Sequence, residues 1–229
     1  MADGYCVTIS GLREDENELK ETARLAGVDL TRMLAVPGDV TDEHDVKKLF
    51  DATLQHFGRV DLLFNNAGVF LPATPVEDIK PSDWRKLVDI NLTGSFLCAQ
   101  AALRVMKVQD PMGGRIINNG SVAAHAPRFR GAAYATSKHA ITGLTRALSL
   151  EGREYNISFC QIDLGNTASP RTNYMEQGML QPDGNKKTEP RMSLDIVAKT
   201  VLFLAGLPND ISVPSLIIMP NKQPFLGRG

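Results

Sequence analysis

Short apolar runs alternate with longer amphipathic stretches along the whole sequence. Val60–Phe64 is an apolar run, the pattern of a strand that is buried on both faces of a parallel sheet. The stretch before this run places Val46, Phe50 and Leu54 at helical spacing and ends at Gly58. Such alternation predicts right-handed βαβ units, and therefore an α/β fold in three layers, with a parallel sheet between two layers of helices. The expected strands lie at 5–10, 32–36, 60–64, 115–118, 157–162 and 215–219, and the expected helices at 14–25 (with a stop at Gly27), 41–58, 81–108, 132–155 and 193–207.

Composition and charge exclude several classes of protein. The chain has 229 residues, of which 43% are hydrophobic and 22% charged, and this mixture fits one globular domain over residues 1–229. A formal charge of −1 provides no attraction to nucleic acid or an anionic membrane. No apolar run approaches the ~20 residues of a membrane span. Three cysteines without a Cys-x-x-Cys pair and four scattered histidines predict a soluble, cytoplasmic protein that binds no metal ion.

Tyr134 and Lys138 stand four residues apart in a predicted helix, so both side chains project from one face. An ammonium group beside a phenol favours the phenolate, and would lower the pKa of the tyrosine from about 10 toward neutral pH. Such a tyrosine can exchange a proton with a carbonyl or alcohol oxygen. Ser121, thirteen residues earlier at the end of a predicted strand, could hold the same oxygen. Taken alone, this spacing of tyrosine and lysine also arises by chance.

Four motifs in register resemble the short-chain dehydrogenase/reductase family, and the resemblance covers nearly the whole chain. It implies a doubly wound, Rossmann-like parallel sheet and an enzyme that transfers hydride between a nicotinamide cofactor and a carbonyl or secondary alcohol substrate. The motifs are Asn65-Asn66-Ala67-Gly68 directly after the strand at 60–64, then Asn91-Leu92-Thr93-Gly94, then Ser121, then Tyr134-Ala135-Thr136-Ser137-Lys138.

The resemblance implies a role for each catalytic candidate. Tyr134 would donate or accept the proton, and Lys138 would lower its pKa and bind the nicotinamide ribose. Ser121 would orient the substrate oxygen. Asn91 would hold a water that relays protons from Lys138 to solvent, although its side chain could equally stabilise a kink in the helix.

Further positions resemble the cofactor-binding residues of the family. Asp39 and Val40 look like the pair that contacts adenine, although Asp39 could be a plain turn residue. The segment Asn65, Asn66, Ala67 and Gly68 resembles the one beside the adenosine, and is also compatible with a simple turn. Gly165 and Thr167 stand where the family has residues near the nicotinamide amide, but Leu164 replaces the usual proline.

Cofactor preference depends on the residues after the strand at 5–10. Members that prefer NAD usually have an acidic residue at the end of this strand, whereas this chain reads Ser10-Gly11-Leu12-Arg13 there. Arg13 could pair with a 2′-phosphate, which favours NADP, with NAD as the other possibility. It could equally be an exposed charge at the start of a helix.

The glycine-rich phosphate loop of the family, TGxxxGxG, does not occur in the sequence. The strand at 5–10 corresponds to the second strand of the family, residues 1–4 look like the turn before it, and the first strand, loop and helix are missing. Because the missing strand would lie at the centre of the sheet, its loss should separate the strands at 5–10 and 32–36 from the one at 60–64. Either the protein begins upstream, or this is a short form in which the strand at 5–10 pairs with the one at 60–64. We expect the chain to bind NADP(H) weakly or not at all.

A cofactor-free, catalytically silent oligomerising or binding subunit is the alternative function. A serine hydrolase through Ser121 is less well supported, because the sequence lacks the Gly-x-Ser-x-Gly elbow and no His/Asp pair is evident. Residues 166–192 would form a substrate lid, in which Tyr174, Met175, Met179 and Leu180 either line an apolar pocket or belong to a short helix. Apolar residues on several faces of the helices at 81–108 and 132–155 predict a homodimer or homotetramer; they include Phe96, Leu97, Leu103, Leu144 and Leu148.

Overall fold

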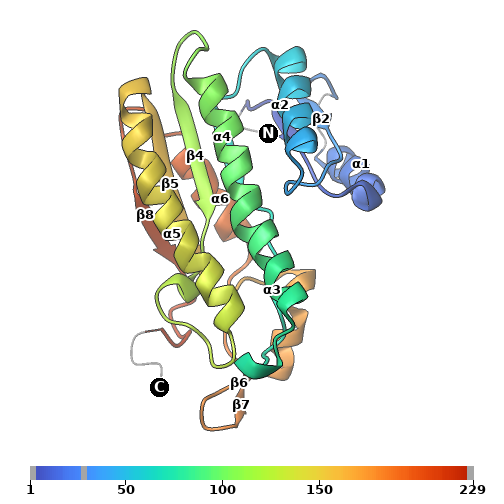
Figure 1. Cartoon of the computed structure of the whole chain (residues 1–229), viewed down its shortest axis with the longest axis vertical. Coiled ribbons are helices and arrows are strands. Elements are labelled where there is room, and N and C mark those ends of the chain that lie inside the picture. The colour runs from blue at the N-terminus through green and yellow to red at the C-terminus, as the bar shows by residue number, and fades with distance from the viewer. Residues whose placement is uncertain (1–3, 27–29, 226–229) are drawn as a thin grey trace.

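The computed structural model describes residues 4–26 and 30–225 (Figure 1). Each expected strand and helix is present in this part of the chain, with ends that shift by a few residues. The helix stop predicted at Gly27, and residues 1–3 of the turn predicted at 1–4, lie outside it. The strands are β1 (Val7–Ile9), β2 (Met33–Ala35), β3 (Leu62–Asn65), β4 (Gly114–Asn119), β5 (Ile157–Leu164), β6 (Met179–Leu180), β7 (Lys186–Lys187) and β8 (Ser215–Ile218). The helices are α1 (Glu16–Leu25), α2 (Glu43–Phe57), α3 (Pro81–Val88), α4 (Gly94–Met106), α5 (Ala132–Gly152) and α6 (Leu194–Ala205).

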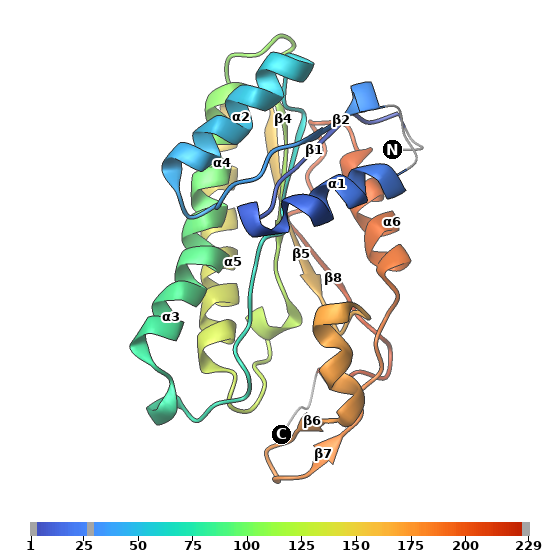
Figure 2. The ribbon, with the colours of Figure 1, turned by 90° about the vertical axis from the view of Figure 1, so that its right-hand side faces the viewer.

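The main sheet is parallel, in the order β3-β4-β5-β8. Helices α4 and α5 cover one face and α6 the other, so the predicted three-layer, doubly wound architecture is confirmed (Figure 2). Asn65 pairs with Asn118, and Asn118 pairs with Gln161, so the carboxyl ends of β3, β4 and β5 lie at the same edge. This edge is where ligands bind in open α/β sheets.

The sheet is split at the predicted place. β1 pairs with β2 in a separate two-stranded parallel sheet, and β3 has β4 as its neighbour. The alternative in which the strand at 5–10 pairs with the one at 60–64 is therefore wrong. Ile116 and Ile117 of β4 are fully buried, whereas Leu62, Leu63 and Phe64 of β3 are only half-buried. The difference follows from position, because β4 has a strand on each side and β3 has one on a single side.

Two apolar clusters fill the space on the two faces of the sheet. The larger packs Cys98, Ala99 and Met106 of α4 against Ile116 and Phe159. The smaller, on the face of α6, is formed by Ile117, Cys160, Ile162 and Leu204. Successive residues of β4 and β5 thus enter opposite clusters, which explains why these strands are buried on both faces.

The apolar residues expected at an oligomer interface serve mostly this core. Leu103 and Leu148 are buried in the larger cluster, and Leu97 and Leu144 are partly buried against it. Phe96 is 39% exposed. The apolar excess on these helices is therefore explained largely within one chain, with Phe96 as the exception.

Arg115 is a buried cation that fastens the loop after α6 to the sheet. Its side chain is 1% exposed, and Nη2 donates to the carbonyl oxygens of Leu207, Pro208 and Ile211 at 3.2, 2.8 and 3.0 Å. We expect Arg115→Met to lower the free energy of unfolding by about 1 kcal/mol, because the loss of the donor for three carbonyl groups outweighs the relief of burying a guanidinium whose Nε and Nη1 have no partner among the described residues. Urea denaturation checks this, with Arg146→Met on the exposed side of α5 as the control. Equal stability of the two variants would contradict the role of Arg115.

Candidate active site

Ser121, Tyr134 and Lys138 come together at the carboxyl edge of the sheet. Ser121 follows β4 and is 8% exposed, and its Oγ accepts from the backbone N–H of Ala123 at 3.1 Å. The hydroxyl of Ser121 lies close enough to the phenol of Tyr134 to favour its ionised form. One helical turn later, Nζ of Lys138 lies 5.7 Å from the centre of the Tyr134 ring. Residues from two elements thus form one constellation, as the sequence spacing predicted.

The protonation of Tyr134 differs from the prediction. Burial of the phenol raises the pKa of Tyr134, and the nearby hydroxyl of Ser121 opposes this rise. The expectation that Lys138 holds this pKa below its ordinary value is therefore wrong for the chain by itself. Desolvation disfavours the phenolate more strongly than the neighbouring groups favour it, so the phenol of Tyr134 keeps its proton at neutral pH.

Lys138 is 5% exposed, and its Nζ donates to the carbonyl oxygen of Asn119 at 2.7 Å. Burial lowers the pKa of Lys138 to about 8, although the charge of Asp163 acts in the opposite direction. The lysine is thus poised to gain or lose its proton near physiological pH.

Asn91 lies in a π-helical turn, Asp89–Thr93, that interrupts the single helix expected over 81–108. Its Nδ2 donates to the carbonyl oxygen of Val69 and to Oγ of Ser137, at 2.9 and 3.0 Å, and its Oδ1 accepts from the N–H of Val69 at 2.8 Å. The amide thus ties the interrupted part of the helix to Val69 and to α5, which is compatible with the interpretation as a stabilised kink. The role in a water relay stays a prediction.

The segment after β3 is held by amide side chains. Nδ2 of Asn65 donates to Oδ1 of Asn118 at 2.8 Å, which ties β3 to β4 inside the protein. Nδ2 of Asn119 donates to Oδ1 of Asn66 at 2.8 Å. Ala67 is exposed, and a Cβ on Gly68 would lie 3.4 Å from Oδ1 of Asn91 and 3.9 Å from Nζ of Lys138. The turn therefore supports the central strands and approaches the catalytic candidates; adenosine contact stays a prediction.

A second group of contacts involves the predicted cofactor residues Asp39, Val40 and Arg13. Oδ1 of Asp39 accepts from the N–H and the hydroxyl of Thr41, both at 2.8 Å, as a turn residue would. Val40 packs against Gly94, where an added Cβ would lie 2.7 Å from it. Arg13 forms an ion pair with Asp45, whose Oδ2 also accepts from the N–H of Asp39 at 2.9 Å. The sequence did not single out Asp45, which links two predicted cofactor residues.

The segment 166–192 is anchored by a buried ion pair. Arg128 Nη2 lies 2.7 Å from Oε2 of Glu189, and Nδ2 of Asn166 donates to the same oxygen at 2.9 Å. Pro170–Gln177 forms the short helix that was one of the two expectations, here a 3₁₀ helix. The ring of Tyr174 from this helix lies 5.4 Å from that of Phe70.

Gly165 and Thr167 begin the same segment. The N–H of Gly165 donates to the carbonyl oxygen of Ile218 at 2.8 Å, and a Cβ on Gly165 would lie 2.5 Å from Oε1 of Gln223. Oγ1 of Thr167 donates to the carbonyl oxygen of Gly165 at 3.1 Å. Both residues lie just beyond the carboxyl end of β5; contact with nicotinamide stays a prediction.

A His/Asp pair stands beside Ser121, contrary to the sequence-based expectation that there is none. Nε2 of His125 and Oδ2 of Asp163 are 2.8 Å apart, and Oδ1 of Asp163 accepts from the N–H of Ser121 at 2.9 Å. The order differs from a hydrolase triad, in which histidine bonds the serine hydroxyl. The sequence held one signal of this pair: Asp163 is an acidic residue that directly continues the apolar run predicted as a strand at 157–162.

The described residues suit the nicotinamide ribose of a cofactor better than its pyrophosphate. Around Lys138, the close approach at Gly68 and the buried Oδ1 of Asn119, which has no hydrogen-bond partner among the described residues, suit a polar ribose. The described residues include no glycine-rich turn from strand to helix that could receive a pyrophosphate.

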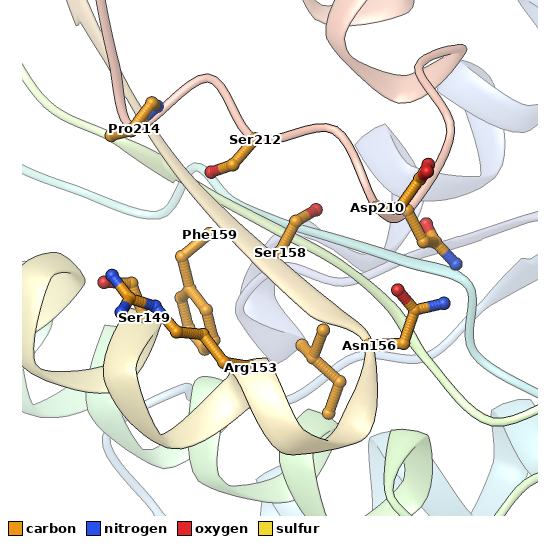
Figure 3. A pocket seen from close by; sticks show the side chains of 10 residues that line it. Ser149, Arg153, Asn156, Ser158, Phe159, Asp210, Ser212 and Pro214 are labelled. Atoms are coloured by element: carbon orange, nitrogen blue, oxygen red, sulfur yellow. The ribbon is translucent and has the colours of Figure 1, made fainter.

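Other features of the described residues lie apart from this site. A cavity of about 290 Å³ opens at the opposite edge of the sheet, and Arg153, directly after α5, and Asp210 are among its lining residues (Figure 3). A second, of about 400 Å³, lies beside Asp39. No group of three or more His, Cys, Asp or Glu in residues 4–26 and 30–225 is placed to hold a metal ion. Within the same ranges, every helix is too short or too polar to cross a membrane.

Curated relatives share much of the chain. Trans-4-hydroxycyclohexanecarboxylate dehydrogenase of Sinomonas cyclohexanicum is 34% identical over 90% of this chain and 78% of its own length. Levodione reductase of Leifsonia aquatica is 32% identical over 81% of this chain and 68% of its own length. The oxidoreductase YohF of Escherichia coli is 37% identical over 74% of this chain, and the match spans 66% of the relative, just under two thirds.

Solved structures have the same fold. A 3-ketoacyl-(acyl-carrier-protein) reductase from Brucella melitensis, complexed with NADH, superposes with a TM-score of 0.83 at 24% identity, over 96% of this chain and 89% of that chain. A family model described as short chain dehydrogenase matches residues 1–179. The chain therefore belongs to the short-chain dehydrogenase/reductase family of nicotinamide-dependent oxidoreductases.

Proposed function

We propose that this chain interconverts a carbonyl compound and a secondary alcohol with NADP(H), through Tyr134, Ser121 and Lys138. The observation that carries the proposal is the position of Tyr134, with the Ser121 hydroxyl close enough to act on its phenol and Nζ of Lys138 5.7 Å from its ring. The nicotinamide cofactor, when bound, supplies or accepts the hydride. Lys138, beside Gly68 and Asn119, is the residue that would hold its ribose.

In carbonyl reduction, Tyr134 donates its proton to the substrate oxygen, which develops negative charge. Ser121 donates a hydrogen bond to the same oxygen and keeps it within reach of the phenol. The ammonium group of Lys138 stabilises the phenolate that remains. In alcohol oxidation the same groups act in reverse, with Tyr134 accepting the proton.

The substrate class that we propose is an alicyclic ketone or alcohol. Two relatives are named for such compounds, trans-4-hydroxycyclohexanecarboxylate and levodione. The aromatic pair Phe70 and Tyr174 supports this choice, because Tyr174 lies near Tyr134 and the two rings offer an apolar surface to an alicyclic ring. Oxidation of NADPH with a panel of cyclic ketones, followed at 340 nm, tests the proposal. Lack of turnover with every ketone, by protein that binds NADPH, would contradict it.

Cofactor preference gives a separate prediction. Arg13 is the cation proposed to pair with the 2′-phosphate, and Asp45 competes for it. We expect Arg13→Ala to weaken NADPH binding by about tenfold with little change for NADH, because one charge-assisted contact is lost. Asp45→Asn should shift the ratio of the two dissociation constants toward NADPH. Fluorescence titration with both dinucleotides measures these ratios; equal effects of Arg13→Ala on both would contradict the assignment.

A catalytically silent binding subunit is the second candidate function. It is favoured by the split sheet and by the absence, among the described residues, of a glycine-rich phosphate loop. The NADPH titration decides between the two functions, because the silent subunit would not bind the dinucleotide. We expect weak binding at most.

We also propose a single domain over residues 1–229, with 166–192 as the substrate lid, that forms a homodimer or homotetramer in the cytoplasm. Exposed Phe96 supports an interface on α4, and three cysteines without a disulfide among the described residues support a reducing compartment. Light scattering after size exclusion tests the assembly, and a monomer would count against it.

A further inference from the structure

Asp163 is an acidic residue in the most deeply buried strand of the sheet. It is 0% exposed, whereas its neighbours along β5 are apolar or amide side chains. Its Oδ1 accepts from Nε2 of Gln161 at 2.7 Å and from the N–H of Ser121 at 2.9 Å. Its Oδ2 lies 2.8 Å from Nε2 of His125. A buried carboxylate with three donors is held in one orientation.

The backbone brings this carboxylate directly under the catalytic serine. Asn119 pairs with Ile162 across β4 and β5, so Gly120 comes next to Asp163. A Cβ on Gly120 would lie 2.0 Å from Oδ1 of Asp163, which no side chain could tolerate. Glycine at this position is therefore what allows the carboxylate to reach the N–H of Ser121.

The charge of Asp163 also acts on the proton-carrying groups. It raises the pKa of Lys138, where burial acts in the opposite direction, and it adds to the rise that burial causes in the pKa of Tyr134. The charge of Asp163 also adds to the rise that burial causes in the pKa of the Cys160 thiol. The other titratable partner is His125, whose side chain is 33% exposed and therefore reaches solvent. Arg128 also acts on Tyr134, and favours its phenolate.

We propose that Asp163 is a positioning residue for the reaction: it fixes Ser121 through the backbone N–H, and its buried charge acts on the neighbouring proton-carrying groups, with His125 as its partner toward solvent. The effect on the reaction follows from the sign of the charge. A carboxylate near Tyr134 disfavours the phenolate, so it favours proton donation and hence carbonyl reduction at neutral pH. This inference rests on the proposed function of Tyr134 and Ser121.

Two substitutions separate the contact from the charge. Asp163→Asn keeps an acceptor for the N–H of Ser121 and removes the charge. Asp163→Leu removes both. We expect Asp163→Asn to lower the pH at which Tyr134 ionises by about one unit, and Asp163→Leu to add a fall in kcat of about tenfold with KM nearly unchanged.

Ionisation of Tyr134 is measured by phenolate absorbance at 295 nm, with the spectrum of the matching Tyr134→Phe double variant subtracted. The pH profile of alcohol oxidation should shift in the same direction as the absorbance. Asp210→Asn, an exposed acidic residue at the opposite edge of the sheet, is the control and should leave both unchanged.

The absorbance titration needs no turnover, so its result does not depend on whether the protein is an oxidoreductase. If the wild-type protein reduces ketones and Asp163→Asn shifts neither readout, the inference is wrong and the proposed function stands. If the wild-type protein is inactive but the shift occurs, the proposed function is wrong and the charge effect is supported.

Should circular dichroism show that the Asp163 variants do not fold, His125→Ala replaces them. This variant opens the carboxylate to water, and a smaller shift in the same direction is expected; no shift would overturn the inference.

Discussion

Replacing Tyr134 by phenylalanine is expected to lower kcat for ketone reduction by between about 10² and 10⁴, the range for loss of a positioned general acid. The substitution removes one oxygen, and with it the interaction of the phenol with Ser121. Because the phenol is the group placed to donate a proton to the substrate oxygen, its loss should affect kcat far more than KM. Steady-state oxidation of NADPH at saturating ketone measures the change.

Tyr174→Phe is the matched control for this experiment. Tyr174 is 42% exposed on the 3₁₀ helix Pro170–Gln177 and carries the same hydroxyl group near the site. We expect its removal to change KM and to leave kcat within about threefold, because it is not placed to donate the proton. Equal losses in the two variants would show that Tyr134 has no special part in the reaction.

Replacing Lys138 by methionine should make the protein more stable and less active. An ammonium group whose pKa falls from 10.5 to about 8 on folding destabilises the fold by about 3 kcal/mol at pH 7. Methionine fills a similar volume without a charge, but it leaves the carbonyl oxygen of Asn119 without its donor, at a cost of about 1 kcal/mol. We therefore expect a net gain of about 2 kcal/mol, together with a fall in turnover of at least about tenfold, because the phenolate loses its neighbouring cation.

The effect of Lys138 on the free energy of unfolding depends on pH. Below about pH 8 the lysine is charged in both states, so the cost of burying the charge is fully present. Between about 8 and 10.5 the folded state has released the proton and the unfolded state has not. Since the unfolded state then binds more protons, wild-type stability rises with pH over this interval relative to Lys138→Met.

Urea denaturation of both proteins at pH 7 and pH 10 measures the difference. Lys199→Met, on the exposed side of α6, is the control for loss of one lysine. The stability gap between wild type and Lys138→Met should narrow at pH 10, while the gap for the control stays constant. A gap that is the same at both pH values would mean that Lys138 is not buried as a charge.

The sequence was sufficient for the order of elements and for placing Tyr134 and Lys138 on one helix face. Apolar runs such as Val60–Phe64 can only be satisfied between two layers, so their alternation with amphipathic stretches required a parallel sheet covered on both faces. The spacing of Tyr134 and Lys138 places both on one helix face wherever that helix lies. Even the split of the sheet could be predicted, because strand order follows from the family resemblance.

Three features depended on contacts that the sequence does not encode locally. The pKa of Tyr134 is set by how much protein surrounds the phenol, which is a property of packing and not of the neighbouring lysine alone. The ion pair of Arg13 with Asp45 joins residues from two elements. The side chain of Asn91, where the helix is interrupted, bonds Val69, which only the fold brings within hydrogen-bond distance.

Asp163 shows most clearly which features the sequence determines and which the fold determines. The sequence determined that an acidic residue stands in an apolar strand, and the tertiary structure decided that Gly120, Ser121 and His125 surround it. Periodicity along a chain reports which face of an element is buried, because burial repeats with the helix or strand. Which polar groups meet inside is decided by strand register and by loops that come from distant positions, so hydrogen-bond partners and pKa values follow from the fold and not from the sequence pattern.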